Sequence, residues 1–253
     1  MQILSLPASY GAAWLRDGWR LLKRQPIGLS AMVVVYTFVM FVPFSIPFPY
    51  VGLVLLGVLS PFATVGLMAA FREVAAGRLP TPTVYGQALQ DQAVRRALLK
   101  LGLIHAALMI AVTLVAGVLI GPLPAPPESE QPTLEDLRIG RMAVVALLYS
   151  PVMVAMWFAP MLTGWHRVDV GKAMFGSAVA FWRNKGAMLV YALLTVCVLV
   201  GAMAIGAAVI GAFFSNQVAP IVAAPVALAL ATFVQASFYP MYRSIFAEPP
   251  AAA

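Results

Sequence analysis

The stretch Gly11–Arg72 decides the fold, and it begins inside the segment YGAAWLRDGWRLLKR, residues 10–24. On a helix with about 100° per residue, the charged side chains of this segment fall on one arc, and its tryptophans and leucines fall on the other. Two long apolar runs follow, separated by a proline-rich turn at residues 43–49. This order predicts an amphipathic helix followed by a hairpin of two membrane-spanning helices.

The same order recurs twice further along the chain. Gly86 and Gly171 each begin a Gly-x-Ala-apolar motif, as Gly11 does, and two apolar runs follow each motif. We therefore predict three helix-plus-hairpin units, at about residues 9–75, 84–167 and 169–245, within one membrane domain that covers residues 1–253. Chance similarity is the alternative, because glycine and alanine are abundant; the shared order of elements is the stronger argument.

The composition indicates an integral membrane protein. Charged residues make up 10% of the chain and apolar residues 62%, whereas about 25% of a soluble domain is charged. Six charge-free runs are long enough to cross a bilayer as helices, which takes about 20 residues each. They lie near residues 27–46, 49–71, 101–120, 142–164, 187–214 and 218–241. The predicted fold is an all-α bundle of six spans.

Lysine and arginine are distributed unevenly between the predicted loops. Of the 16 such residues, only Arg138 and Arg141 fall on one side of the spans, and the other fourteen fall on the opposite side. Loops rich in lysine and arginine remain in the cytoplasm, so we expect both termini there. Because this bias accounts for the net charge of +7, we expect no nucleic-acid partner.

Two further segments are predicted to lie outside the bilayer. Residues 122–141 form an extracytoplasmic loop that is rich in proline and acidic residues, and residues 247–253 form a flexible tail. A solvated loop is the simpler interpretation of residues 122–141. The alternative is a docking site for a basic partner.

The basic residues beside the spans are candidates for binding anionic lipid headgroups. They are Arg16, Arg20, Lys23, Arg24, Arg95, Arg96, Lys100, Lys172, Arg183 and Lys185. We expect the apolar sides of the three amphipathic segments to lie in the acyl boundary of the membrane. The alternative is that these charges only set the topology and anchor the chain.

Candidates for helix packing or for contact with a solute lie inside the spans. Pro61, Pro151 and Pro225 interrupt the even-numbered spans, and Pro151 together with Pro160 makes span four the most irregular. Gln235 is the most polar side chain deep in a span, and we expect it to bond to a neighbouring helix. Small residues at four-residue spacing in spans five and six predict a tight seam, either between these spans or between subunits.

Several function classes are disfavoured by what the sequence lacks. No charged residue lies within the spans, as ion pumps generally require. No catalytic motif occurs, and His105 and His166 have no further metal ligands nearby in the sequence, so we expect no enzyme, cofactor or metal site. We expect a non-enzymatic protein that binds lipid or a protein partner, including a second copy of itself. The alternative is a channel or transporter for a neutral or apolar solute.

The opening pattern carries a resemblance. With Trp14, Gly18, Trp19 and Pro26 in order after Gly11, it resembles the start of a family of uncharacterised proteobacterial inner-membrane proteins. In that family a Gly/Trp-rich amphipathic helix precedes the first hairpin, and the next span carries a proline and then a glycine. The resemblance covers about the first 75 residues. It implies a bacterial inner membrane and six spans, and it implies no activity or functional residue.

Overall fold

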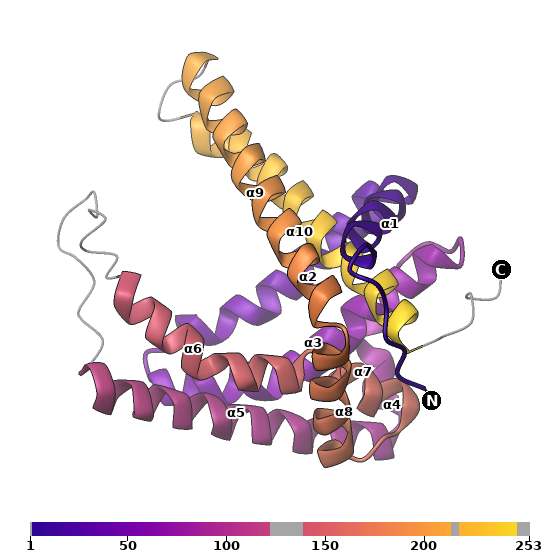
Figure 1. The fold of residues 1–253 in the computed structure, drawn as a ribbon, viewed down its shortest axis with the longest axis vertical. Helices are drawn as coiled ribbons and strands as arrows, with labels where there is room; N and C mark the ends of the chain where they lie inside the picture. The colour runs from indigo at the N-terminus through magenta and orange to yellow at the C-terminus, as the bar shows by residue number, and fades with distance from the viewer. Residues whose placement is uncertain (1, 122–138, 214–217, 247–253) are drawn as a thin grey trace. The chain divides into compact units, whose positions relative to one another are not determined.

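The computed structural model describes residues 2–121, 139–213 and 218–246. The predicted tail lies outside these residues, as does nearly all of the predicted loop at 122–141. All regular elements in the described part of the chain are helices (Figure 1). This confirms the predicted all-α fold.

Six helical segments are long and apolar enough to cross a membrane. They are Pro26–Ser45, Tyr50–Ala75, Gln92–Ile120, Met142–His166, Lys185–Phe213 and Ile221–Ile245. The helices that form them are α2 (Pro26–Phe41), α3 (Pro49–Ala75), α5 (Gln92–Ile120), α6 (Ile139–Met156), α7 (Ala159–His166), α9 (Lys185–Phe213) and α10 (Ala219–Ile245), and the 3-10 helix η1 (Val42–Ser45) extends α2. Each predicted span is matched by one of these segments.

Three shorter helices precede the three pairs of spans. They are α1 (Tyr10–Arg24), α4 (Val84–Gln90) and α8 (Val170–Arg183). The order of elements is therefore the predicted one, while the equivalence of the three units stays a prediction. The second short helix differs from expectation: it ends before Asp91, whose backbone is extended, and it contains no Lys or Arg. Its expected charges, Arg95, Arg96 and Lys100, lie instead on the first turns of α5.

The chain folds into two compact units, each built from separate stretches of sequence. One contains residues 1–39, 62–92 and 179–253, and the other contains residues 40–61 and 93–178. The division passes through α3 directly after Pro61. It does not follow the boundaries of the three predicted repeats.

In the first unit, α1 packs against both helices of the α9–α10 hairpin (Figure 1). Trp14 is buried in this contact, and its indole Nε1 donates a hydrogen bond of 2.8 Å to Ser244 Oγ. Leu15 and Leu22 are buried beside it. The structure therefore corrects the predicted position of this apolar face: it packs mainly on protein, and only Trp19, which is 50% exposed, keeps a large apolar surface open.

Two glycines allow α1 to lie this close. A Cβ atom on Gly11 would be 2.5 Å from the carbonyl oxygen of Ala187, and one on Gly18 would be 2.6 Å from the Cα of Ser237. Both obstacles are backbone atoms of the hairpin. Small residues at such positions let helix backbones approach each other.

Asn184 fastens the segment before α1 to the same hairpin. This buried side chain accepts a bond of 2.9 Å from the Leu6 amide, and it donates bonds of 2.9 Å to the carbonyls of Leu4 and Ala180. The Leu4 amide also donates to the carbonyl of Ile245. The backbone before α1 is thus held by Asn184, which lies between α8 and α9, and by the end of α10.

A third contact in this unit links α4 to the first hairpin. The Tyr85 hydroxyl donates a bond of 2.7 Å to the carbonyl of Met32, and its ring lies against Gly66. Burial raises the pKa of Tyr85, so the phenol keeps the proton that it donates.

In the second unit, α3 and α5 approach each other closely. A Cβ atom on Gly57 would be 2.6 Å from the Cα of Ala106, and one on Gly102 would be 2.8 Å from the Cα of Val58. The glycines of the small-residue pattern in span five behave differently. Nothing lies within 4 Å of a Cβ built on Gly206 or Gly211, so these positions form no tight seam with the described part of the chain.

Span four is interrupted, as its prolines predicted. Helix α6 ends at Met156 and α7 begins at Ala159, directly before Pro160, while Pro151 lies inside a continuous α6. The buried Ser177 of α8 fills the break: its hydroxyl accepts a bond of 3.0 Å from the Phe158 amide and donates one of 2.7 Å to the Val154 carbonyl. These are the two groups that a regular helix would pair with each other, so Ser177 is inserted into the helical ladder.

His105 is buried in the second unit. Its Nδ1 lies 2.9 Å from Ser60 Oγ, and its Nε2 lies 2.8 Å from the Tyr149 hydroxyl. The Ser60 hydroxyl also lies 3.1 Å from the carbonyl of Gly57, to which it can donate. This chain of bonds joins three spans.

Candidate functional site

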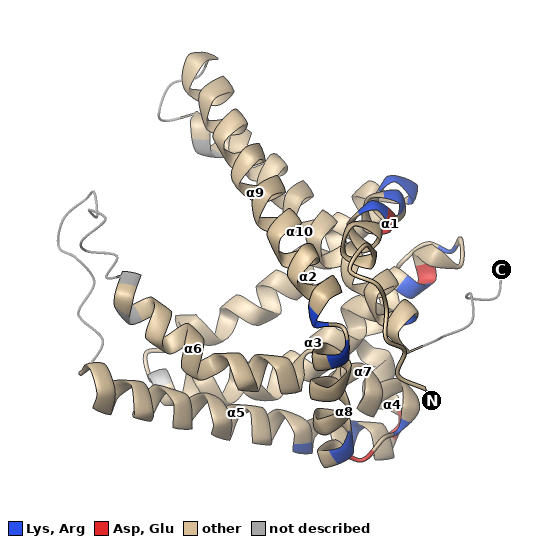
Figure 2. Cartoon of the chain, viewed as in Figure 1, with Lys and Arg blue, Asp and Glu red and all other residues tan. Residues whose placement is uncertain are grey.

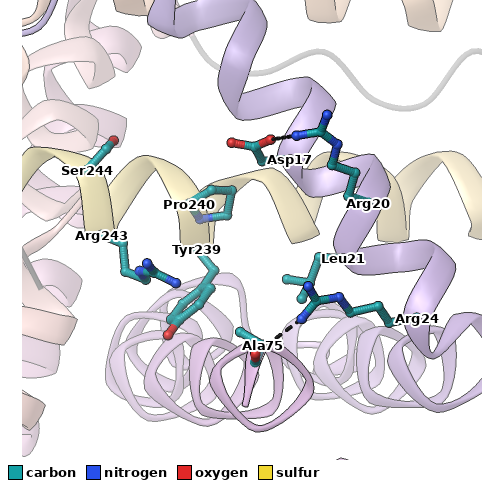
Figure 3. A pocket seen from close by; sticks show the side chains of 9 residues that line it. All are labelled: Asp17, Arg20, Leu21, Arg24, Ala75, Tyr239, Pro240, Arg243 and Ser244. Carbon is teal, nitrogen blue, oxygen red and sulfur yellow. Dashed lines mark hydrogen bonds and ion pairs between the residues drawn. The ribbon is translucent and has the colours of Figure 1, made fainter. Parts of the chain in front are cut away.

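A pocket of about 550 Å³ lies beside α1, next to the last two turns of α10 (Figure 3). Its walls are Asp17, Arg20, Leu21 and Arg24 from α1, Tyr239, Pro240, Arg243 and Ser244 from α10, and Ala75 at the end of α3. All of these residues belong to the first unit. The buried face of α1 positions the site, because the contact of Gly18 with Ser237 fixes how far the α1 arginines lie from Arg243.

The pocket is basic. It contains three guanidinium groups and one carboxylate. Figure 2 shows several charged residues on α1, while α9 and α10 are uncharged between their ends. Arg20 donates a bond of 3.0 Å to Asp17. The guanidinium carbon of Arg243 lies 5.9 Å from the centre of the Tyr239 ring, a cation–π contact that leaves its N–H groups available.

Arg24 also has a structural contact. It donates a bond of 3.2 Å to the carbonyl of Ala75, the last residue of α3, where helix carbonyls lack intrahelical partners. Within the described residues no carboxylate forms an ion pair with Arg24 or Arg243. Capping of α3 uses one of the five N–H donors of the Arg24 guanidinium, so the others remain for a ligand. The pocket thus has positive charge left to bind an anion.

The described residues contain no group of His, Cys, Asp and Glu side chains that could hold a metal ion. The chemistry of this pocket is that of arginine, which binds planar or tetrahedral oxyanions through paired N–H groups. A phosphate group fits this donor set.

Comparison with known proteins gives the chain a relative over almost its whole length. It is 33% identical over 260 residues to a protein of Burkholderia thailandensis named as a probable inner membrane protein, and the match covers 97% of this chain and 94% of the relative. The chain belongs to this family of proteobacterial inner-membrane proteins. The match confirms the resemblance seen in the first 75 residues and extends it across all six spans. No family model matches the chain, and no solved structure matches it.

The structure brings together only part of the predicted headgroup set. Arg20 and Arg24 line the basic pocket, and Arg16 lines a separate apolar groove on α1. The other predicted residues are exposed on α1, α5, α8 and the start of α9, and none of them lines the pocket: Lys23, Arg95, Arg96, Lys100, Lys172, Arg183 and Lys185. On α8, the predicted apolar face remains open at Phe175 and Trp182.

Arg243 is the functional candidate that was missing from the predicted set. It is the one basic residue of α10, and more than two hundred residues separate it from Arg20 and Arg24. Its position at the end of the last span was the available signal. Only the docking of α1 on α10 shows that these side chains share a pocket.

The packing candidates have different surroundings. Gln235 is half-buried, and it makes no hydrogen bond with the described part of the chain, so the expected bond to a neighbouring helix is absent there. Pro61 is buried inside a continuous α3, whereas Pro151 and Pro225 are exposed inside continuous helices. None of these prolines opens a gap in its helix.

Proposed function

We propose that this chain is a non-enzymatic inner-membrane protein that binds the phosphate headgroups of anionic phospholipids on the cytoplasmic side. The observation that carries the proposal is the convergence of Arg20, Arg24 and Arg243 on one pocket with a single carboxylate, Asp17. The lysine and arginine bias of the loops supports cytoplasmic termini. In this orientation α1 and the charged end of α10 lie at the level of the headgroups.

Docking of α1 on the hairpin distinguishes this site from a general basic surface. A free amphipathic helix attracts anionic lipids through its average charge. Here the guanidinium groups of two helices are held at one place, so a single phosphate can receive bonds from both. Charge-assisted bonds of this kind are about twice as strong as neutral ones.

The test is lipid retention measured by native mass spectrometry in nanodiscs that contain phosphatidylglycerol and phosphatidylcholine. The double variant Arg24→Gln/Arg243→Gln should lower the preference for phosphatidylglycerol about tenfold or more, because each lost charged bond is worth about 1.5–3 kcal/mol. The matched control is Arg95→Gln/Arg96→Gln, two exposed arginines on α5. Equal preference in both double variants would refute the proposal.

A second arm separates a lipid headgroup from a soluble phosphate compound. Inorganic phosphate at millimolar concentration should leave lipid retention unchanged, because the lipid is also held by its chains. If inorganic phosphate displaces the lipid, or if the protein retains phosphate in phosphatidylcholine alone, the ligand is a soluble anion.

A channel or transporter for a neutral or apolar solute is the second candidate. The interruption between α6 and α7 favours it, since broken helices often mark transport sites. At this break, however, Ser177 binds both freed backbone groups, which leaves neither to a solute. Solute flux in proteoliposomes that depended on Pro151 or Gln235 would support this alternative, and unchanged flux in both variants would count against it.

A further inference from the structure

A second hollow lies on α1, separate from the basic pocket. This groove has a volume of about 440 Å³ and lies where α1 meets the middle parts of α9 and α10. Its apolar walls are Leu15 and Trp19 of α1, Val198 of α9, and Val226, Ala229 and Phe233 of α10. Its one charged residue is Arg16. The groove and the basic pocket have no lining residue in common.

The depth of the groove follows from the lengths of the helices. Helix α9 has 29 residues, which is about 43 Å at 1.5 Å per residue, so it exceeds the roughly 30 Å hydrocarbon core. Val198 is 13 residues beyond Lys185, about 20 Å along α9. Val226 is 17 residues before Arg243, about 26 Å along α10. Val198 and Val226 therefore lie inside the hydrocarbon region, whichever way the hairpin tilts within ordinary limits.

The α1 end of the groove has the composition of a membrane interface. The Trp19 ring packs edge-on against Phe233 at 5.9 Å, and the Lys23 ammonium lies 6.0 Å from the centre of the Trp19 ring. Tryptophan together with lysine and arginine is typical of the headgroup level. The Arg16 side chain is 63% exposed, and its Nε lies 3.7 Å from Asp17, which is too long for a strong bond and leaves it able to bind a phosphate.

We propose that the groove holds one acyl chain of an anionic phospholipid from the leaflet that contacts α1, with its phosphate at Arg16 and Lys23. The groove begins at a cationic, aromatic rim and continues between two spans. This order fits a lipid, whose charged headgroup is followed by apolar chains. At roughly 30 Å³ for each group of the size of a water molecule or methylene, the volume of about 440 Å³ holds about 15 such groups. This number corresponds to one acyl chain. The site deepens the proposed function by adding a binding position for an acyl chain. It rests on that function only for the negative charge of the headgroup.

The first test fills the groove. The variant Ala229→Phe places a ring where the chain would lie, and Ala224→Phe is the matched control, because Ala224 is exposed on the same helix and does not line the groove. Native mass spectrometry in phosphatidylglycerol nanodiscs should show one lipid fewer per chain for Ala229→Phe than for the control. Equal lipid counts, with both variants folded by circular dichroism, would overturn the proposal.

The second test uses a probe of position. Phosphatidylglycerol with brominated acyl chains should strongly quench the fluorescence of Trp19. The quenched fraction that belongs to Trp19 is the difference in quenching between the parent protein and Trp19→Phe. This fraction should fall at least twofold in Ala229→Phe and stay unchanged in Ala224→Phe. Brominated phosphatidylcholine should quench less, so that about tenfold more of it is needed for the same quenching. The variant Arg16→Gln/Lys23→Gln should remove this difference between the two lipids. Quenching that is the same for all variants would show ordinary boundary lipid and refute the site.

The two proposals fail separately. Loss of a lipid in Ala229→Phe together with no effect of Arg24→Gln/Arg243→Gln would retain the groove and reject the basic pocket. The opposite pair of results would retain the pocket and reject the groove.

Discussion

Replacement of Gly18 by alanine tests the contact on which both lipid sites depend. The new Cβ atom would lie 2.6 Å from the Cα of Ser237 and 2.7 Å from its amide nitrogen, whereas ordinary contact begins at 3.4 Å. Because both obstacles are backbone atoms, α1 must withdraw by about 0.8 Å, the difference between 3.4 Å and 2.6 Å. The bond from Trp14 to Ser244, now 2.8 Å, would lengthen to about 3.6 Å and be lost.

The expected loss of stability combines three effects. Overpacking costs about 1–3 kcal/mol, and the lost hydrogen bond costs about 0.5–1.5 kcal/mol. Alanine is better than glycine inside a helix by about 1 kcal/mol, which offsets part of this. We therefore expect Gly18→Ala to lower the free energy of unfolding by about 0.5–3.5 kcal/mol.

The assay is unfolding in mixed detergent micelles, followed by circular dichroism and tryptophan fluorescence. The matched control is Gly86→Ala in α4, where nothing lies within 4 Å of the new Cβ atom, so the variant should be neutral or stabilised by up to about 1 kcal/mol. Gly18→Ala should also weaken phosphatidylglycerol retention, since α1 carries Arg20 and Arg24. If Gly18→Ala and Gly86→Ala unfold with the same free energy, α1 is not docked as described.

Four further variants test the polar contacts that sequence analysis did not find. Ser177→Ala removes both bonds at the break in span four and should cost about 1–3 kcal/mol in unfolding free energy, less if the helix closes across the gap; the exposed Ser150→Ala should change it by less than about 0.5 kcal/mol. Asn184→Ala leaves the Leu6 amide and the Leu4 carbonyl without their side-chain partner, so proteinase K should cleave the segment before α1 sooner than in the parent protein. His105→Phe should cost about 1–3 kcal/mol in thermal unfolding, and Tyr149→Phe, which loses one bond, about 0.5–1.5 kcal/mol.

The spans were predictable from the sequence because their signal is local. A run such as residues 187–214 needs only its own length and lack of charge to be recognised, and the observed α9 differs from it by two residues or fewer at each end. Irregularity in span four was predictable in the same way from Pro151 and Pro160. The identity of the residue that fills the break was not, because Ser177 lies on another helix.

The position of the apolar face of α1 was not predictable from its amphipathic pattern. A helix with one apolar side has the same pattern whether that side meets lipid or protein. The available signal was Gly11 and Gly18, seven residues apart on that side, since a lipid-facing surface has no need of two glycines. The alanine and glycine row of span five shows the limit of this reasoning. It has the same small residues, but no atom of another described element lies within 4 Å of a Cβ atom built on Gly206.

Docking changes what the charges of α1 can do. On a free helix, Arg20 and Arg24 would attract any anionic surface by about 1 kcal/mol each, and salt would screen this attraction beyond a Debye length of about 10 Å at 0.1 M. Held against α10, the same groups lie in one pocket with Arg243, and a bound phosphate would contact them at hydrogen-bond distance, where screening is weak. The cation that completes the pocket is contributed by the last span, so the proposed selectivity for a headgroup would require the first and last helices to be packed together.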